Sequence, residues 1–252
     1  LHKGLDIQRS ISPGVTGLIV GYVQSGKTLS FTGVLALLAD NGFKLAIILG
    51  GTKNNLLDQT IERLHVDLDV TKRNWKKVKI ENDLAGLSRA LISNNAPLVI
   101  YPLLKHHKHI RDFVNSLVEF GIEPSGLGNV VIIDDEADQA SLNTLASKPS
   151  EIGETSSTYE QIVSLKAAFP LHIYYQYTAT PQAPILIDIQ DVLSPDFHYV
   201  LDPGIGYVGG IELFRDREHQ IVEIPEMEVY HHTDNPLESC PKSLREAVCA
   251  FI

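Results

Sequence analysis

The stretch GYVQSGKT, residues 21–28, decides the fold. It matches the pattern G-x-x-x-x-G-K-[ST], whose backbone N–H groups cradle phosphate oxygens while the lysine reaches the β- and γ-phosphates. This pattern needs a strand before it and a helix after it. GLIV, residues 17–20, is a short apolar run typical of a buried strand, and residues 28–42 space their leucines as a helix does and end with Asn-Gly. The sequence therefore predicts a phosphate-binding loop at a strand–helix junction.

The loop supplies the candidate nucleotide ligands. Lys27 would bind the β- and γ-phosphates and assist catalysis, and the Thr28 hydroxyl would hold Mg²⁺. ATP and Mg²⁺ are the expected cofactors. The alternative is an ordinary glycine turn before a helix. The expected cofactor-binding residues are Gly21, Gln24, Ser25, Gly26, Lys27 and Thr28.

Apolar runs and helical patterns alternate along the rest of the chain. Such alternation predicts an α/β fold, a mainly parallel sheet with helices on both faces. We expect residues 1–200 to form one ATP-binding lobe and residues 201–252 to begin a following region of a longer protein. The polar segment 141–158 is interpreted as a surface loop. Strands are expected at residues 44–51, 97–104, 129–135 and 172–180, and helices at 54–65, 83–95 and 108–121.

Composition narrows the class of protein. Of the 252 residues, 44% are hydrophobic, enough for a full core. The balance of 21 Lys and Arg against 31 Asp and Glu gives a net charge of −10, which argues against binding nucleic acid over the whole surface. Cys240 and Cys249 have no metal-ligand spacing and favour a reducing compartment. No apolar run suggests a membrane span or a signal peptide, so a cytoplasmic location is expected.

A second motif follows an apolar strand at VVIIDDEAD, residues 130–138. A buried strand that ends in carboxylates beside a phosphate loop can order Mg²⁺ and polarise the attacking water. We assign Asp135 to Mg²⁺ and Glu136 to the water. Asp134 could shift this assignment by one residue and become the metal partner. The alternative is a solvated acidic turn.

The phosphate loop, D-E-A-D at residues 135–138 and TAT at residues 178–180 occur in the order of motifs I, II and III of superfamily-two helicases and translocases. The strings GYVQSGKT, IIDDEADQAS and YTATPQAP more specifically resemble the endonuclease-domain ATPases of bacteria that sit in restriction-like and phage-defence gene clusters. The resemblance covers roughly residues 10–215. It implies a first RecA-like lobe, a second lobe elsewhere in the same protein, and ATP-driven movement along nucleic acid, with duplex DNA favoured.

The resemblance also implies contacts with a nucleic-acid backbone. Thr52 and Lys53, in LGGTKNNLLDQT, lie where the first contact is expected, and Lys105, in YPLLKHH, lies where a second is expected. Solvated loops are the alternative at both places. Gln8 stands where some of these enzymes read adenine, although an ordinary surface glutamine is the stronger interpretation.

The hydroxyls of Thr178 and Thr180 are small enough to bond the Asp138 carboxylate and couple hydrolysis to the nucleic-acid face. Simple capping of a strand end is the alternative. His106 and His109 share a helix face but lack further metal ligands nearby, and TKRNWKKVK, residues 71–79, is either a nucleic-acid contact or a solvated turn.

Two activities are disfavoured and one alternative stays open. A nuclease centre needs an acidic strand with a D/E-x-K pattern, which we do not find, and a small-molecule kinase would not need the water-activating Glu136. A non-motor ATPase switch that controls a partner or a nuclease domain remains the alternative function. Arg215, Arg217 and Arg245 stand in no recognisable motif, so the charge-stabilising arginine is expected from the second lobe, and this chain alone should hydrolyse ATP poorly.

Overall fold

The computed structural model describes residues 14–51, 54–68, 78–92, 98–139, 157–185, 191–215, 223–224 and 241–251. The chain divides into two compact units, Leu1–Ile205 and Gly206–Ile252. The second unit contains a π-helical turn at Ile211–Arg215 and the helix α8, Lys242–Phe251. Within the described ranges, no helix combines the length and apolar character that a bilayer crossing requires.

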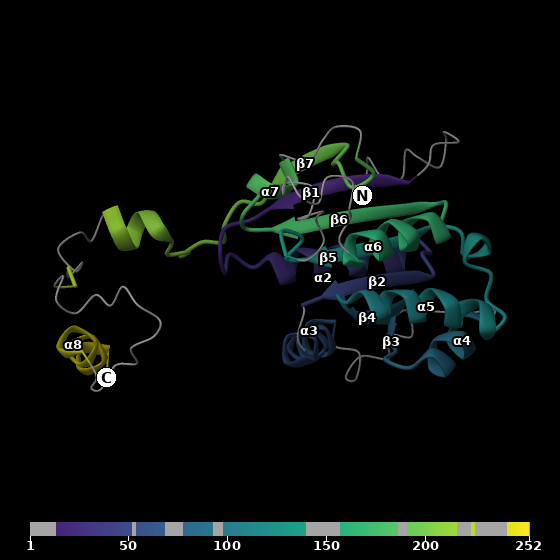
Figure 1. The fold of residues 1–252 in the computed structure, drawn as a ribbon, viewed down its shortest axis with the longest axis horizontal. Coiled ribbons are helices and arrows are strands. Elements are labelled where there is room, and N and C mark those ends of the chain that lie inside the picture. Colours follow the sequence, from purple (N-terminus) through teal and green to yellow (C-terminus); the bar gives the residue numbers. More distant parts are fainter. Residues whose placement is uncertain are drawn as a thin grey trace. The chain divides into compact units, whose positions relative to one another are not determined.

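The first unit is built on a seven-stranded sheet with the order β3-β4-β2-β5-β6-β1-β7 (Figure 1). Every pair of neighbouring strands is parallel. This order places β6 between β1, which leads into the phosphate loop, and β5, which ends in the carboxylates. The strands are β1 Val15–Val20, β2 Leu45–Gly50, β3 Val78–Ile80, β4 Leu98–Leu104, β5 Val130–Asp135, β6 His172–Thr178 and β7 Phe197–Val200.

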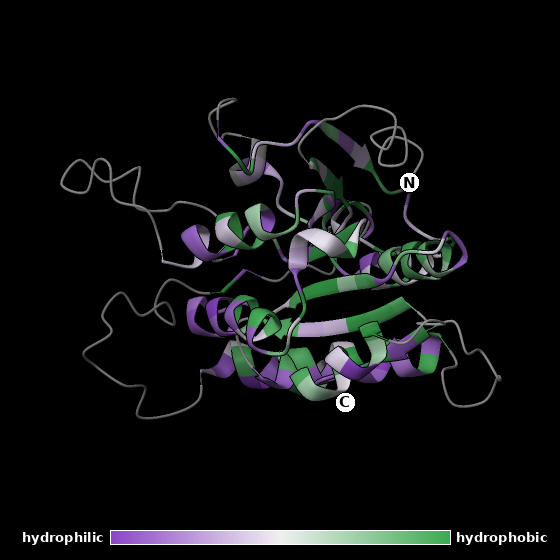
Figure 2. Cartoon of the chain, turned by 90° about the vertical axis from the view of Figure 1, so that its right-hand side faces the viewer, coloured by the Kyte–Doolittle hydropathy of each residue, from purple (hydrophilic) through white to green (hydrophobic). Residues whose placement is uncertain are grey.

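Helices cover both faces of the sheet, as Figure 2 shows with the apolar strands between them. The helices α2 and α3 pack on one face, and α4, α5 and α6 pack on the other. This confirms the predicted α/β fold with a parallel sheet covered on both sides. The helices of this unit are α2 Lys27–Asp40, α3 Asn54–Asp67, α4 Leu84–Ile92, α5 His107–Glu119, α6 Ser157–Ala168 and α7 Gln182–Ile185, with a 3₁₀ turn at Pro124–Leu127.

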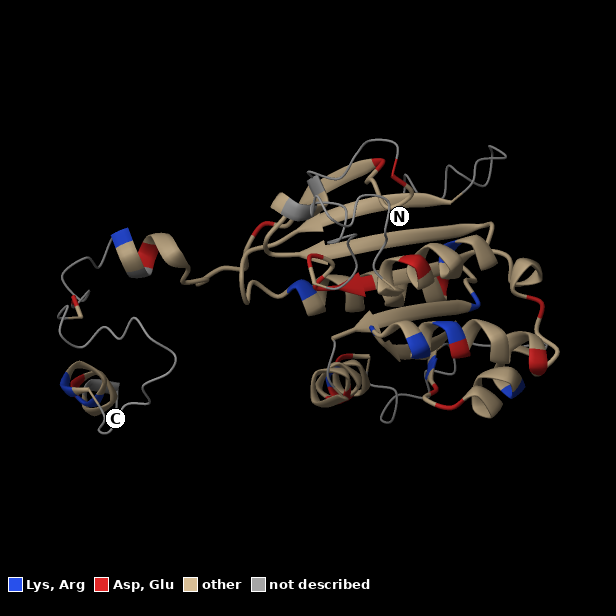
Figure 3. Ribbon diagram, viewed as in Figure 1, with Lys and Arg blue, Asp and Glu red and all other residues tan. Residues whose placement is uncertain are grey.

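The central strands are continuous apolar runs because both of their faces are buried. Along β2, Ala46 and Ile48 contribute to the core under α2 and α3, whereas Leu45, Ile47 and Leu49 contribute to the opposite core. All five are fully buried. Each buried leucine or isoleucine contributes about 1.5–3 kcal/mol relative to exposure. Charged residues therefore gather on the helices and at the ends of strands, as Figure 3 shows.

Candidate nucleotide-binding site

The phosphate loop connects β1 to α2 and is fixed at its start to β6. The Gly21 backbone N–H donates to the Thr178 carbonyl at 3.0 Å. A Cβ atom at Gly21 would come within 2.8 Å of Lys27 Cγ, so this position has room only for glycine. Gly26 has a φ of 92°, in the left-handed region that favours glycine, and Gln24 holds a φ of 56°. The backbone of the loop thus favours glycine at position 26, and the close approach of the Lys27 side chain favours it at position 21.

The amino terminus of α2 is suited to an anion. No side chain caps this helix, and its first turn contains no acidic residue. Backbone N–H groups at the start of a helix, together with the helix dipole, attract phosphate. The Lys27 ammonium donates to the Tyr22 carbonyl at 3.0 Å and so lies folded along the loop.

The acidic turn at the end of β5 contains three consecutive carboxylates, Asp134, Asp135 and Glu136, and they lie in different environments. Asp134 is fully buried, lies 2.6 Å from the Lys105 ammonium and accepts a hydrogen bond from the Tyr174 hydroxyl at 2.5 Å. It therefore has no access to a metal ion beside the phosphate loop. Asp135 and Glu136 both line the pocket next to that loop. The geometry favours Asp135 over Asp134 as the Mg²⁺ ligand.

Asp135 and Glu136 are both partly buried, but each has a distinct feature. Burial raises the pKa of Asp135, and the nearby Lys105 ammonium opposes this shift. A divalent cation at Asp135 would favour the ionised form. Glu136 has a φ of 56°, which is unusual for a residue other than glycine. Such a backbone is found where the surrounding structure fixes a residue firmly.

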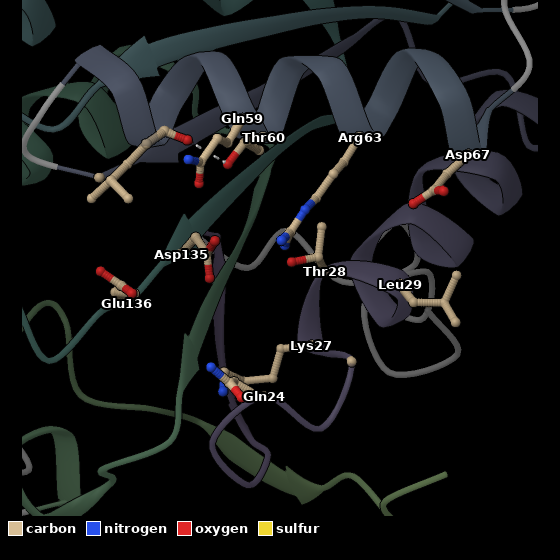
Figure 4. A pocket seen from close by; sticks show the side chains of 13 residues that line it. Gln24, Lys27, Thr28, Leu29, Gln59, Thr60, Arg63, Asp67, Asp135 and Glu136 are labelled. Carbon is tan, nitrogen blue, oxygen red and sulfur yellow. Dashed lines mark hydrogen bonds between the residues drawn. The ribbon is translucent and has the colours of Figure 1, made fainter. Parts of the chain in front are cut away.

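These elements enclose a pocket of about 680 Å³ (Figure 4). The phosphate loop and the start of α2 form one wall, the turn after β5 a second, and α3 a third. No ligand-binding role for the polar face of α3 was predicted, because a polar stripe on an isolated helix looks like a solvated surface. The lining residues are Gln24, Gly26, Lys27, Thr28, Leu29, Gly51, Leu56, Gln59, Thr60, Arg63, Asp67, Asp135 and Glu136.

Lys105 corrects one sequence-based prediction. It was expected to contact a nucleic-acid backbone, but its side chain is 1% exposed and its ammonium faces Asp134. The same ammonium donates to the carbonyls of Asp135 and Glu136, at 2.5 and 2.9 Å. A backbone phosphate cannot reach this group without disrupting a buried ion pair. Lys105 instead holds the acidic turn in place.

Asp138 is bonded to the end of β6 as the sequence suggested. The Thr178 hydroxyl donates to Asp138 Oδ1 at 2.6 Å, and the Thr180 hydroxyl donates to Oδ2 at 2.8 Å. The Thr178 oxygen also accepts the Thr180 backbone N–H at 2.9 Å. The acidic turn and the TAT segment therefore form one hydrogen-bonded unit.

Several predicted residues lie outside the described ranges. These are Gln8, Thr52, Lys53, residues 71–77, and residues 141–156 of the segment interpreted as a surface loop. The rings of His106 and His109 lie 5.8 Å apart, but the described residues contain no group of three or more His, Cys, Asp or Glu side chains able to hold a metal ion. His106 instead accepts the Lys108 N–H and caps α5.

No protein-family model and no curated protein matches the sequence. Among solved structures, the chain is similar to the genome-packaging NTPase B204 of Sulfolobus turreted icosahedral virus 2 in complex with ATP-gammaS, at 14% identity and a TM-score of 0.35. The match covers 66% of this chain and 65% of that one.

Two further structures are similar. The Pyrococcus furiosus Hef helicase domain matches at 15% identity with a TM-score of 0.44, covering 79% of this chain and 37% of that one. Drosophila ORC bound to DNA matches at 14% identity with a TM-score of 0.26, covering 71% of this chain and 90% of that one. At these low identities and scores the likenesses carry no functional inference, and the fold assignment depends on the sheet itself.

Proposed function

We propose that the first unit of this chain binds ATP with Mg²⁺ and hydrolyses it. The observation that carries the proposal is the pocket in which Lys27 and Thr28 of the phosphate loop face Asp135 and Glu136 across the sheet edge (Figure 4). A phosphate chain in this pocket would lie against the N–H groups of α2.

Each side chain has a distinct task in this proposal. Lys27 leaves the Tyr22 carbonyl and binds the β- and γ-phosphates. Thr28 and Asp135 would hold Mg²⁺, which would neutralise charge on the phosphates. Glu136 orients a water for attack on the γ-phosphorus and accepts its proton. As the water oxygen bonds to the γ-phosphorus, the bond from that phosphorus to the bridging oxygen of the β-phosphate breaks, and ADP and phosphate leave as products.

Motor activity on nucleic acid, with duplex DNA favoured, is the finer part of the proposal. It is supported by the motif order and by the hydrogen bonds of Asp138 with the TAT segment. A second lobe of the same protein would complete the motor, and a cytoplasmic role in restriction or phage defence follows from the resemblance alone. A non-motor ATPase switch is the competing function. It would bind and hydrolyse ATP without any stimulation by DNA or RNA.

The test compares Lys27→Ala, Glu136→Gln and the control Glu119→Gln, an exposed position on α5. Binding of a fluorescent ATP analogue and release of phosphate are measured with and without DNA. We expect Lys27→Ala to weaken ATP binding and to abolish hydrolysis, and Glu136→Gln to bind ATP while turnover falls by about 10²–10⁴-fold. Native turnover in either variant would refute the assignment.

A further inference from the structure

One face of α3 lines the pocket beside the phosphate loop. Gln59, Thr60, Arg63 and Asp67 are spaced by one, three and four residues, which places them on one side of a helix. All four line the pocket, whereas Leu64 points into the core under α2 and α3. The helix is therefore amphipathic, and its polar face forms a wall of the proposed nucleotide site.

Arg63 is the only cation on this wall among the described residues. In Figure 4 its guanidinium extends from α3 across the pocket toward Thr28. The guanidinium forms no ion pair and no hydrogen bond with any described residue. Asp67 lies one helical turn further along α3 but is not paired with it. Thr60 differs, since its hydroxyl donates to the Leu56 carbonyl at 3.1 Å.

We propose that Arg63 binds the terminal phosphate of ATP from the side opposite Lys27. This inference rests on the proposed function, because it takes the pocket to be the ATP site. The guanidinium is a planar donor that matches two phosphate oxygens at once, which an ammonium does not. The side chain extends toward Thr28, which together with Asp135 would hold Mg²⁺ beside the terminal phosphates. It therefore reaches the γ-phosphate end of the nucleotide.

An arginine within this lobe changes the expectation drawn from the sequence. The charge-stabilising arginine was expected only from a second lobe. Arg63 supplies a second cation in addition to Lys27 within one chain, so the lobe would distinguish ATP from ADP by itself. Because α3 carries this arginine, loss of the γ-phosphate would also release one wall of the pocket.

The test measures the affinities of Mg-ATP and Mg-ADP by calorimetry in the native protein and in Arg63→Ala, Arg63→Lys and the control Arg89→Ala. Arg89 is exposed on α4, on the other side of the sheet. We expect Arg63→Ala to weaken ATP binding about tenfold to a hundredfold and to change ADP binding less than about twofold. Arg63→Lys should recover part of the loss, and Arg89→Ala should behave as native.

Different outcomes contradict different claims. Equal weakening of ATP and ADP would place Arg63 on the inner phosphates, and native affinities in Arg63→Ala would remove it from the site; both overturn the inference. An effect confined to DNA-stimulated turnover would make it a nucleic-acid contact and would also overturn it. If the native protein binds neither nucleotide, or binds ATP equally well after Lys27→Ala, the proposed function itself fails. Arg63 is exposed, so the variant should fold, and its melting curve checks this.

Discussion

Replacing Lys105 with methionine should destabilise the protein severely. The ammonium lies 2.6 Å from the fully buried Asp134 carboxylate and donates to the carbonyls of Asp135 and Glu136. Methionine fills a similar volume but leaves the carboxylate with only the Tyr174 hydroxyl as a partner. Removing one member of a buried ion pair costs about 3–5 kcal/mol because the remaining charge is uncompensated. For a domain of this size that corresponds to a fall in melting temperature of about 6–20 °C.

A double variant separates the ion pair from general packing. In Lys105→Met with Asp134→Asn, the neutral amide oxygen can still accept from Tyr174, and no charge is buried. We expect it to recover most of the lost stability. Urea unfolding followed by circular dichroism gives the free energies, with an unchanged denaturant slope as the check on two-state behaviour.

The same experiment decides between two roles of Lys105. A nucleic-acid contact would leave the free energy of unfolding near native and weaken DNA binding. The buried role would be refuted if Lys105→Met loses less than about 1 kcal/mol, or if the double variant is no more stable than the single one.

Two further variants test other parts of the fold. Thr178→Val removes a donor to Asp138 and an acceptor for the Thr180 N–H, so we expect stability to fall by about 1–3 kcal/mol. ATP affinity should stay near native, whereas stimulation of ATP turnover by nucleic acid should be lost. Undiminished stimulation by DNA would show that the pair only caps the end of the strand. Burial lowers the pKa of Lys166 from 10.5 to about 8, so between these values the unfolded chain binds more protons than the folded one and stability rises with pH. From pH 8 to pH 10 Lys166 should contribute about 2 kcal/mol of added free energy of unfolding, measured as the difference between the native protein and Lys166→Met, and a curve of equal slope in Lys166→Met would contradict this.

The central strands could be predicted because each is a continuous apolar run. The strand expected at 44–51 is observed at Leu45–Gly50, and the one expected at 129–135 is observed at Val130–Asp135. The edge strands were missed for physical reasons. β3 has three residues, Val78–Ile80, too few to show a period, and β7, Phe197–Val200, has only four, with His198 interrupting the apolar residues.

Long-range pairing explains what else the sequence could not indicate. The run from Leu98 to Leu104 ends in Lys105, and a lysine after a strand is usually solvated. Its burial depends on Asp134, far along the chain, and only the order β4-β2-β5 brings their ends together. The helix α3 was predicted, but the lining of the pocket by its polar residues was not. By contrast, the phosphate loop and the carboxylates at the end of β5 were identified because each is a short local pattern: glycines with Lys-Thr in the first, and an apolar run followed by acidic residues in the second.

β6 lies between β1 and β5, so it anchors both the phosphate loop and the acidic turn. Its end accepts the Gly21 N–H at the Thr178 carbonyl and the Ala137 N–H at the Tyr177 carbonyl. Adjacent residues of a single strand therefore fix the positions of the phosphate loop and the acidic turn relative to each other. A one-residue insertion in β6 would shift both attachment points together and exchange the faces of its side chains. We expect the length of β6 to be held constant during divergence, while the outer strands β3 and β7 are free to lengthen, shorten or be lost.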